Sequence, residues 1–181
     1  MVHSALAIVI VTSFGVAGTA QIPYTPDLAA QRAAMKKLAF LVGKWSGDAS
    51  MLRTPGQAIE MSQTEEAQFK LDGLILQIEG VGRAKSDGKP ILQAFGLISF
   101  DDESRTYQMR AFNDGRWLEC EVKPGEDGAS LSWGFTIGPV KTSSVLRINQ
   151  EGDWTESHEI TIGTAPARHF MDVTVRRVKP R

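Results

Sequence analysis

The sequence contains one cysteine, Cys120, in 181 residues. A chain with a single cysteine forms no internal disulfide, so a buried core must stabilise the fold. The charges balance, with 20 Lys and Arg against 21 Asp and Glu, and no basic stripe or long acidic tail is present. We therefore expect no nucleic-acid partner. The Gly-x-Ser-x-Gly, phosphate-loop and His-Glu-x-x-His motifs are also missing, so no named reaction is indicated.

The first twenty residues contain no Asp, Glu, Lys or Arg, and Ala5 to Val11 form an apolar run. Small residues at Gly18 to Ala20 precede a possible cleavage site. This pattern predicts a signal peptide over residues 1–20, a linker over 21–26 and an exported bacterial protein, periplasmic or secreted. The alternative is an uncleaved membrane anchor, for which the apolar stretch is short. After cleavage we expect no stable membrane anchor.

A short helix is predicted after the linker. Thr25 can cap it, Pro26 suits its first turn and Gly43 can end it. Apolar residues with roughly helical spacing follow the cap: Leu28, Met35, Leu38 and Leu41.

From Gly43 onward the hydrophobic period is two, and turn signals such as Asp87-Gly88 and Asp114-Gly115 recur. The pattern predicts about ten strands joined by tight turns. Closing them into a barrel removes the exposed sheet edges. We therefore expect an all-β domain over 27–181: a single up-and-down antiparallel barrel, with the helix closing one end. A flattened two-sheet sandwich is the competing geometry.

The segment Gly43-Lys-Trp45-Ser-Gly47 stands where the helix meets the first strand. A Gly-x-Trp in this place resembles the calycin superfamily, which includes lipocalins, fatty-acid-binding proteins and nitrobindins. The resemblance implies that Trp45 plugs one end of the barrel and that a basic residue of the last strand packs on it. Arg177 is that residue if the last strand pairs antiparallel with the first.

Residues 36–179 resemble a family of uncharacterised exported bacterial calycin-like proteins. The resemblance rests on KLAFLVGKWSGDASM, LDGLILQIEGVGR, YQMRAFNDGRW, WTESHEITI and RHFMDVTVRRV. It implies the barrel and no settled activity. Nitrobindins also carry a haem-binding His on the last strand, and this narrower resemblance implies that His169 is its counterpart. Asp48 to Ser50 replace the glycines that continue the nitrobindin motif.

Apolar alternation predicts which polar side chains point into the barrel. The inward face of residues 59–71 carries Gln63 and Glu65, and that of 153–162 carries Glu156 and His158. In the last strand, His169 shares a face with Met171, Val173, Val175 and Arg177. Either Tyr107, Met109 and Ala111 or Gln108, Arg110 and Phe112 face inward in residues 106–112, so Arg110 is a candidate, as is Arg116.

Polar groups inside an aromatic-walled barrel are typical of a small-molecule pocket. The predicted pocket residues are Gln63, Glu65, Arg110, Trp133, Glu156, His158 and His169. Other interpretations remain: Glu156 and His158 form an internal pair or lie at a solvated mouth, His169 is a rim residue, Trp117, Trp133 and Trp154 are core residues, and Cys120 is an inert buried thiol.

These residues lead to four hypotheses about function. The first is a binding protein that holds a small, largely apolar molecule. The second is a haem or metal protein that uses His158 or His169, the histidines left after removal of the signal peptide. The third is an enzyme with Glu156 and His158 as an acid–base pair. The fourth is a filled barrel without a ligand.

Overall fold

The fold is that of a computed structural model, which describes residues 24–54, 56–113 and 115–179. The predicted signal peptide, residues 1–20, lies outside the described residues, as does the first half of the predicted linker. Residues 24–26 are exposed and have no regular secondary structure.

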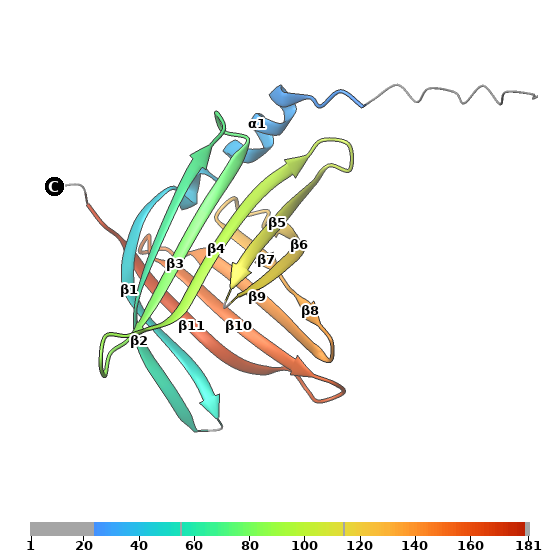
Figure 1. The fold of residues 1–181 in the computed structure, drawn as a ribbon. Helices are drawn as coiled ribbons and strands as arrows, with labels where there is room; N and C mark the ends of the chain where they lie inside the picture. The colour runs from blue at the N-terminus through green and yellow to red at the C-terminus, as the bar shows by residue number, and fades with distance from the viewer. Residues whose placement is uncertain (1–23, 55, 114, 180–181) are drawn as a thin grey trace, which may run out of the picture.

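Over the described residues the chain forms one α-helix, one 3₁₀ helix and eleven strands (Figure 1). The elements are α1 (Leu28–Lys36), η1 (Ala39–Leu41), β1 (Gly43–Thr54), β2 (Gln57–Lys70), β3 (Ile75–Ala84), β4 (Pro90–Asp101), β5 (Thr106–Asn113), β6 (Arg116–Pro124), β7 (Ser130–Trp133), β8 (Thr136–Ile137), β9 (Val140–Ile148), β10 (Trp154–Ile162) and β11 (Arg168–Arg177).

The strands close into an antiparallel barrel, as predicted. The ring runs β1 to β7 in chain order, then β9, β10 and β11, and β11 pairs with β1. The two-residue strand β8 is a side branch that pairs only with β9. Because β10 joins β9 as well as β11, the sheet has no free end at this seam, and the sandwich alternative is wrong.

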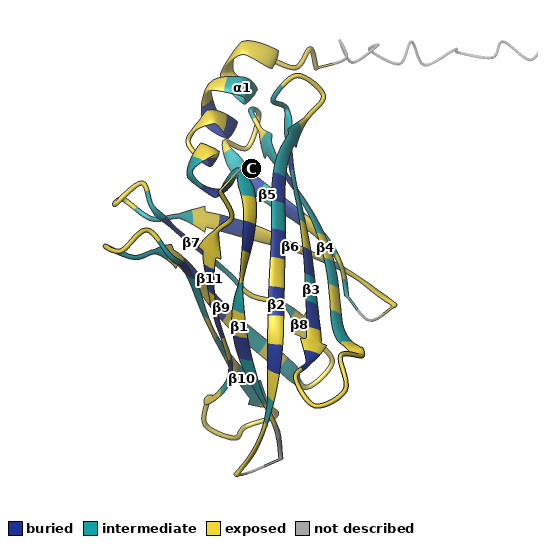
Figure 2. Cartoon of the chain, turned by 90° about the vertical axis from the view of Figure 1, so that its left-hand side faces the viewer, coloured by how far each residue is buried: buried dark blue, intermediate teal, exposed yellow. Residues whose placement is uncertain are grey.

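Helix α1 and η1 cover one end of the barrel (Figures 1 and 2). Three apolar residues of the segment that they form with the turn between them are fully buried: Met35, Leu38 and Leu41. The Tyr107 hydroxyl of β5 donates to the Ala34 carbonyl at 2.9 Å. The helix also differs in detail from the prediction. Asp27, and not Thr25, is the N-cap, because its Oδ1 accepts from the backbone N–H groups of both Ala29 and Ala30 at 3.0 Å.

The Gly-x-Trp-x-Gly segment closes the same end from the strand side. Trp45 is 2% exposed, and its Nε1 donates to the Leu41 carbonyl at 2.9 Å. Its cross-strand partner in β11 is Arg177, whose guanidinium carbon lies 4.1 Å from the indole centroid. Gly47 permits the close approach of β1 and β11, because a Cβ there would collide with the Thr174 carbonyl. The predicted pairing of Trp45 with Arg177 is confirmed.

Alternate residues along the strands face the interior, as the buried and exposed stripes of β2 show in Figure 2. In the core, Trp45 packs edge-on against Trp154 of β10 with the ring centroids 5.5 Å apart. The closed end is therefore solid, and any internal space lies beyond these two indoles, toward the other end.

Candidate functional site

The interior of the barrel contains a cavity of about 410 Å³. Its walls are mainly apolar, and several strands contribute small residues, among them Gly80, Ala94, Gly96 and Ala111. No Lys or Arg is among the lining residues described. The side chains with polar ends in the lining are Gln63, Glu65, Asn113, Thr142, Ser144, Trp133, Trp154, Glu156 and His158. The volume and the apolar walls are those of a small-molecule site.

The strand registers order the polar groups by depth. Glu65 of β2 is the cross-strand partner of Trp45, so it lies near the closed end, with Gln63 one inward position farther along. On β10, Trp154 pairs with Val175 at the depth of Gln63, and Glu156 and His158 follow toward the open end. The cavity therefore has a polar floor.

Gln63 and Glu65 form the deepest polar pair. They are 1% and 8% exposed, and Gln63 Nε2 donates to Glu65 Oε1 at 2.6 Å. The residues directly opposite on β3 are Gly82 and Gly80. A Cβ at Gly80 would lie 2.7 Å from Glu65 Oε2, and one at Gly82 would lie 2.7 Å from Gln63 Oε1. The two glycines thus leave the room in which these side chains fit.

Burial raises the pKa of the Glu65 carboxyl well above its usual value, and the nearby charge of Glu156 adds to this effect. The hydrogen bond from Gln63 acts in the opposite direction and is weaker. Burial and the Glu156 charge thus both make the charged form of Glu65 less favourable than that of an exposed glutamate. Gln63 Oε1, in contrast, is buried and has no hydrogen-bond partner. A buried acceptor left unpaired costs about 1–3 kcal/mol.

Glu156 and His158 form an internal pair, and not a solvated one, because their side chains are 13% and 14% exposed. Glu156 accepts from Trp154 Nε1 at 2.8 Å, and its other oxygen lies 2.9 Å from His158 Nε2. With Nε2 donating to the carboxylate, His158 Nδ1 accepts from the Ser144 hydroxyl at 2.8 Å. The imidazole lies edge-on to Trp133 and Phe170.

The structure does not bring His169 to this site, in contrast to the prediction. His158 pairs with Met171 and Glu159 with His169, so Phe170 is the extra residue of a β-bulge. The bulge reverses the phase of the strand: Phe170 lines the cavity, while His169 is exposed and lies 2.7 Å from Asp172 on the outside. The match to a haem-binding last-strand histidine therefore fails in position.

Arg110 also lies outside the barrel. It is exposed and pairs with Glu119 of β6 at 2.9 Å, while Tyr107, Met109 and Ala111 face inward. Both faces of this strand carried apolar residues, so alternation left the choice open. Arg116 is exposed too.

The remaining predicted residues divide between wall, core and surface. Trp133 lines the cavity, Trp154 is a core residue whose N–H reaches the polar cluster, and Trp117 is 54% exposed. Cys120 is half-buried, and burial raises the pKa of its thiol to about 11, as expected for an inert cysteine. Sequence reasoning missed Ser144, although the alternation of Ser144, Leu146 and Ile148 would have placed it inward.

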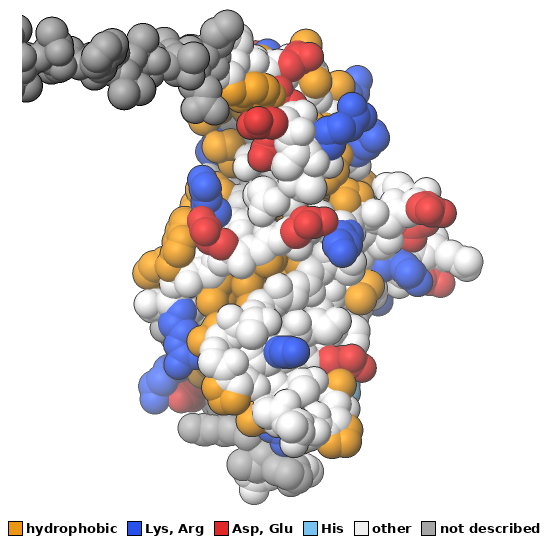
Figure 3. Space-filling model, turned by 90° about the vertical axis from the view of Figure 1, so that its right-hand side faces the viewer, with side chains coloured by type: hydrophobic (Ala, Val, Ile, Leu, Met, Phe, Trp, Pro, Cys, Tyr) orange, Lys and Arg blue, Asp and Glu red, His pale blue; other side chains and the backbone are white. Residues whose placement is uncertain are grey.

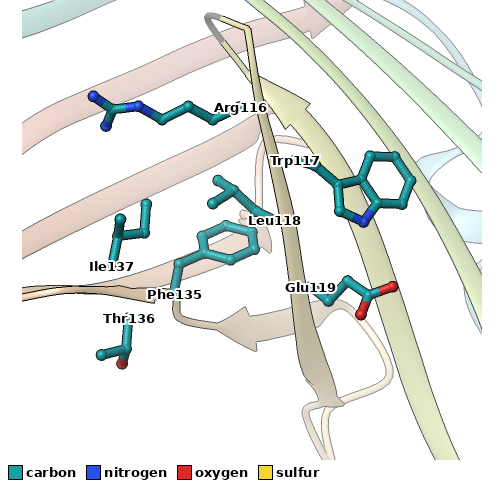
Figure 4. A pocket seen from close by; sticks show the side chains of 7 residues that line it. All are labelled: Arg116, Trp117, Leu118, Glu119, Phe135, Thr136 and Ile137. Atoms are coloured by element: carbon teal, nitrogen blue, oxygen red, sulfur yellow. The ribbon is translucent and has the colours of Figure 1, made fainter.

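A slot in the barrel wall leads toward the cavity. Strands β6 and β7 pair only at Lys123–Ser132 and Pro124–Leu131, so the first half of β6 has no ladder partner on this side. A hollow of about 430 Å³ lies here, lined by Arg116 to Glu119 and Phe135 to Ile137. Figure 4 shows Leu118, Phe135 and Ile137 grouped between β6 and β8, while Trp117 and Glu119 point to the other side of β6.

Leu118, Phe135 and Ile137 line both the hollow and the internal cavity. The view from the β8 side shows hydrophobic side chains reaching the surface in the middle of this face (Figure 3). The slot is thus an apolar side route into the barrel.

Within the part of the chain that the structure describes, no group of three or more His, Cys, Asp and Glu is arranged to hold a metal ion. Among the same residues, no helix is long and apolar enough to cross a membrane. What the site offers is an apolar enclosure with a carboxyl group, an unpaired amide oxygen and a hydrogen-bonded Glu–His–Ser chain.

Solved structures share the fold. A crystal structure of Rv2717c from M. tuberculosis aligns with a TM-score of 0.64 at 15% identity, over 81% of this chain and 98% of the other. The S-type phycobiliprotein lyase CPES from Guillardia theta aligns with a TM-score of 0.59 at 12% identity, over 82% and 94%. No family model matches the chain, and no curated protein matches it in sequence. At these identities the likeness shows the barrel fold alone.

Proposed function

We propose that this protein is an exported, periplasmic or secreted, small-molecule-binding barrel that holds a largely apolar ligand in its internal cavity. The observation that carries the proposal is Gln63 Oε1, a buried acceptor without a partner at the floor of an apolar-walled cavity of about 410 Å³. A barrel that served only as a packed core would gain stability from an apolar residue at this position. A bound molecule that donates to this oxygen removes the cost.

The test is a titration of the purified protein with prodan, an uncharged dye whose emission depends on polarity. We expect saturable binding of one dye per barrel with a blue-shifted emission. Gly96→Phe should weaken binding at least about tenfold, because a side chain at Gly96 extends into the cavity, where its Cβ has only Met109 and Ile78 near it at 3.8 and 4.0 Å.

Gln93→Leu is the matched control, because Gln93 is on the same strand and exposed. It should bind prodan as the wild type does. No saturable binding by the wild type, or equal binding by Gly96→Phe, contradicts the proposal.

An enzyme is the second candidate, favoured by the Glu156–His158–Ser144 hydrogen-bond chain. A hydroxyl bonded to an imidazole that a carboxylate orients is the arrangement of an activated serine. Hydrolysis of p-nitrophenyl octanoate that is lost in Ser144→Ala and kept in the exposed Ser143→Ala would favour this candidate. Absence of turnover leaves the binding role as the function to pursue.

A further inference from the structure

The cavity has more acidic than basic side chains in its lining, where the His158 imidazole is the one basic group described. Two carboxyl groups, Glu65 and Glu156, line it, and no Lys or Arg is among the lining residues described. The nearest guanidinium of the closed end, that of Arg177, lies over Trp45 and donates to the carbonyls of Phe40 and Val42. Its N–H groups are therefore committed to the barrel closure. A ligand with an anionic head would meet two carboxyl groups in the lining and no fixed cation.

The unpaired atom in the floor is an acceptor. Gln63 is 1% exposed, its Nε2 is committed to Glu65, and its Oε1 has no partner. A bound molecule satisfies this oxygen if it donates a hydrogen bond to it. Glu156 already accepts from Trp154 and from His158, so it supplies negative charge without requiring a new hydrogen bond.

Aromatic rings surround the polar groups. Trp133 and Phe170 both lie edge-on to His158, and Trp154 Nε1 donates to Glu156. The faces of such rings attract cations through their quadrupoles, most strongly where water is excluded.

On the premise of the proposed ligand-binding function, we infer that the cavity selects apolar molecules that end in a primary ammonium group. The head lies on the polar floor, donating to Gln63 Oε1 and balancing Glu65 and Glu156, and the tail fills the apolar part toward the slot. An ammonium group has three donors and no acceptor, which suits a site with an unpaired acceptor and two carboxyl groups.

The head group also affects proton binding. The groups that face Glu65 are Gln63 on its own strand and Glu156 and His158 from β10. A cation beside Glu65 opposes the effects of burial and of Glu156, so it lowers the pKa of the Glu65 carboxyl when the ammonium group binds. Binding of an ammonium head should therefore release more protons than binding of a neutral head of the same size.

The experiment compares octylammonium, octanol and octanoate as competitors of prodan at pH 7. The tail is constant, so differences report the head group alone. We expect octylammonium to compete at concentrations at least about tenfold lower than octanol, since a charge-assisted hydrogen bond contributes more than a neutral one. Octanoate should be the weakest of the three.

Glu65→Gln should reduce the ratio between octanol and octylammonium affinities toward one, because it removes one carboxyl group and keeps the volume. Glu66→Gln is the matched control: Glu66 is the next residue of β2, points outward and pairs with Lys44 at 3.3 Å. It should keep the wild-type ratio. The wild-type series decides the question even if Glu65→Gln does not fold.

The outcomes separate the two proposals. If prodan binds but octanoate competes as well as octylammonium, the inference about the head group is overturned and the proposed function stands. If neither prodan nor any octyl compound binds, the proposed function fails and the inference fails with it.

Discussion

Glu65 is a carboxyl group held in an apolar enclosure by a neighbouring amide and by a glycine across the sheet. In the folded state the charged form of this group is desolvated and lies near Glu156, and both effects raise its pKa. Ionising Glu65 therefore requires more free energy in the barrel than in water. A core that served for packing alone would be more stable with an apolar residue at this position, whereas a binding site can use a buried carboxyl group. At the scale of single residues, Glu65 and Gln63 carry the functional argument.

The pH dependence of stability should reveal this group. The folded-state pKa of Glu65 is raised above the model-peptide value of 4.5, so between these two values the folded protein binds more protons than the unfolded chain. The contribution of Glu65 to stability is therefore fully present below pH 4.5 and is lost as the pH rises through the folded pKa.

We expect Glu65→Gln to be more stable than the wild type at pH 8, with the difference shrinking toward pH 5. Urea unfolding of both proteins across this range measures the difference. Glu66→Gln should run parallel to the wild type. A Glu65→Gln protein that is less stable at pH 8 than at pH 5, relative to the wild type, would mean that Glu65 is charged and well paired in the barrel.

Alternation along the strands was sufficient to find Gln63, Glu65, Glu156 and His158, because each lies in an unbroken run of inward apolar residues. It failed at His169, where a single bulged residue, Phe170, reverses the phase. Bulges are set by the pairing of two strands, so the sequence of one strand does not reveal them. The unpaired state of Gln63 Oε1 was likewise beyond prediction, since it depends on atoms from several strands.

At the scale of elements, the closure of β11 on β1 holds the barrel together. Trp45 and Arg177 meet at this seam, beside η1, and the guanidinium also donates to the Phe40 carbonyl at 3.0 Å. One contact thus ties together the first strand, the last strand and the 3₁₀ helix.

Arg177→Met should lower the free energy of unfolding by about 1–3 kcal/mol, because it removes the cation–π contact and the charged hydrogen bonds while keeping an apolar stem. The neighbouring Arg176→Met is the control. Arg176 is exposed and pairs with Asp153 at 3.3 Å, so its removal should cost less than 1 kcal/mol, in the range of surface ion pairs. Equal effects in urea unfolding would show that Arg177 has no special part in closure.

The sequence predicted the helix and the strands better than the way in which neighbouring strands pair and the helix begins. The strands and the helix followed from period and turn residues, and the closing Trp–Arg pair followed from the family resemblance that the Gly-x-Trp segment carries. The slot between β6 and β8 was not predicted. It arises where the β6–β7 ladder stops after two residue pairs, and the length of a ladder depends on both strands together. The Asp27 cap was missed since Thr25, Pro26 and Asp27 all suit a helix start.

At the scale of the whole molecule, the question is whether the barrel is filled or open. The closed end is packed by Trp45, Trp154 and the helix, whereas glycine and alanine on β4 and β5 leave the middle open. Composition does not distinguish these cases, because the volume depends on which small residues face one another. The cavity, its polar floor and the slot are the features on which the proposed binding function rests.

Native mass spectrometry of the purified protein with octylammonium tests this claim most directly, in the wild type and in Gly96→Phe. The account predicts a single adduct per wild-type barrel, strongly reduced in Gly96→Phe and unchanged in Gln93→Leu. A wild-type barrel that forms no adduct, or a Gly96→Phe barrel that forms as much as the wild type, would contradict the assignment of the cavity as the binding site.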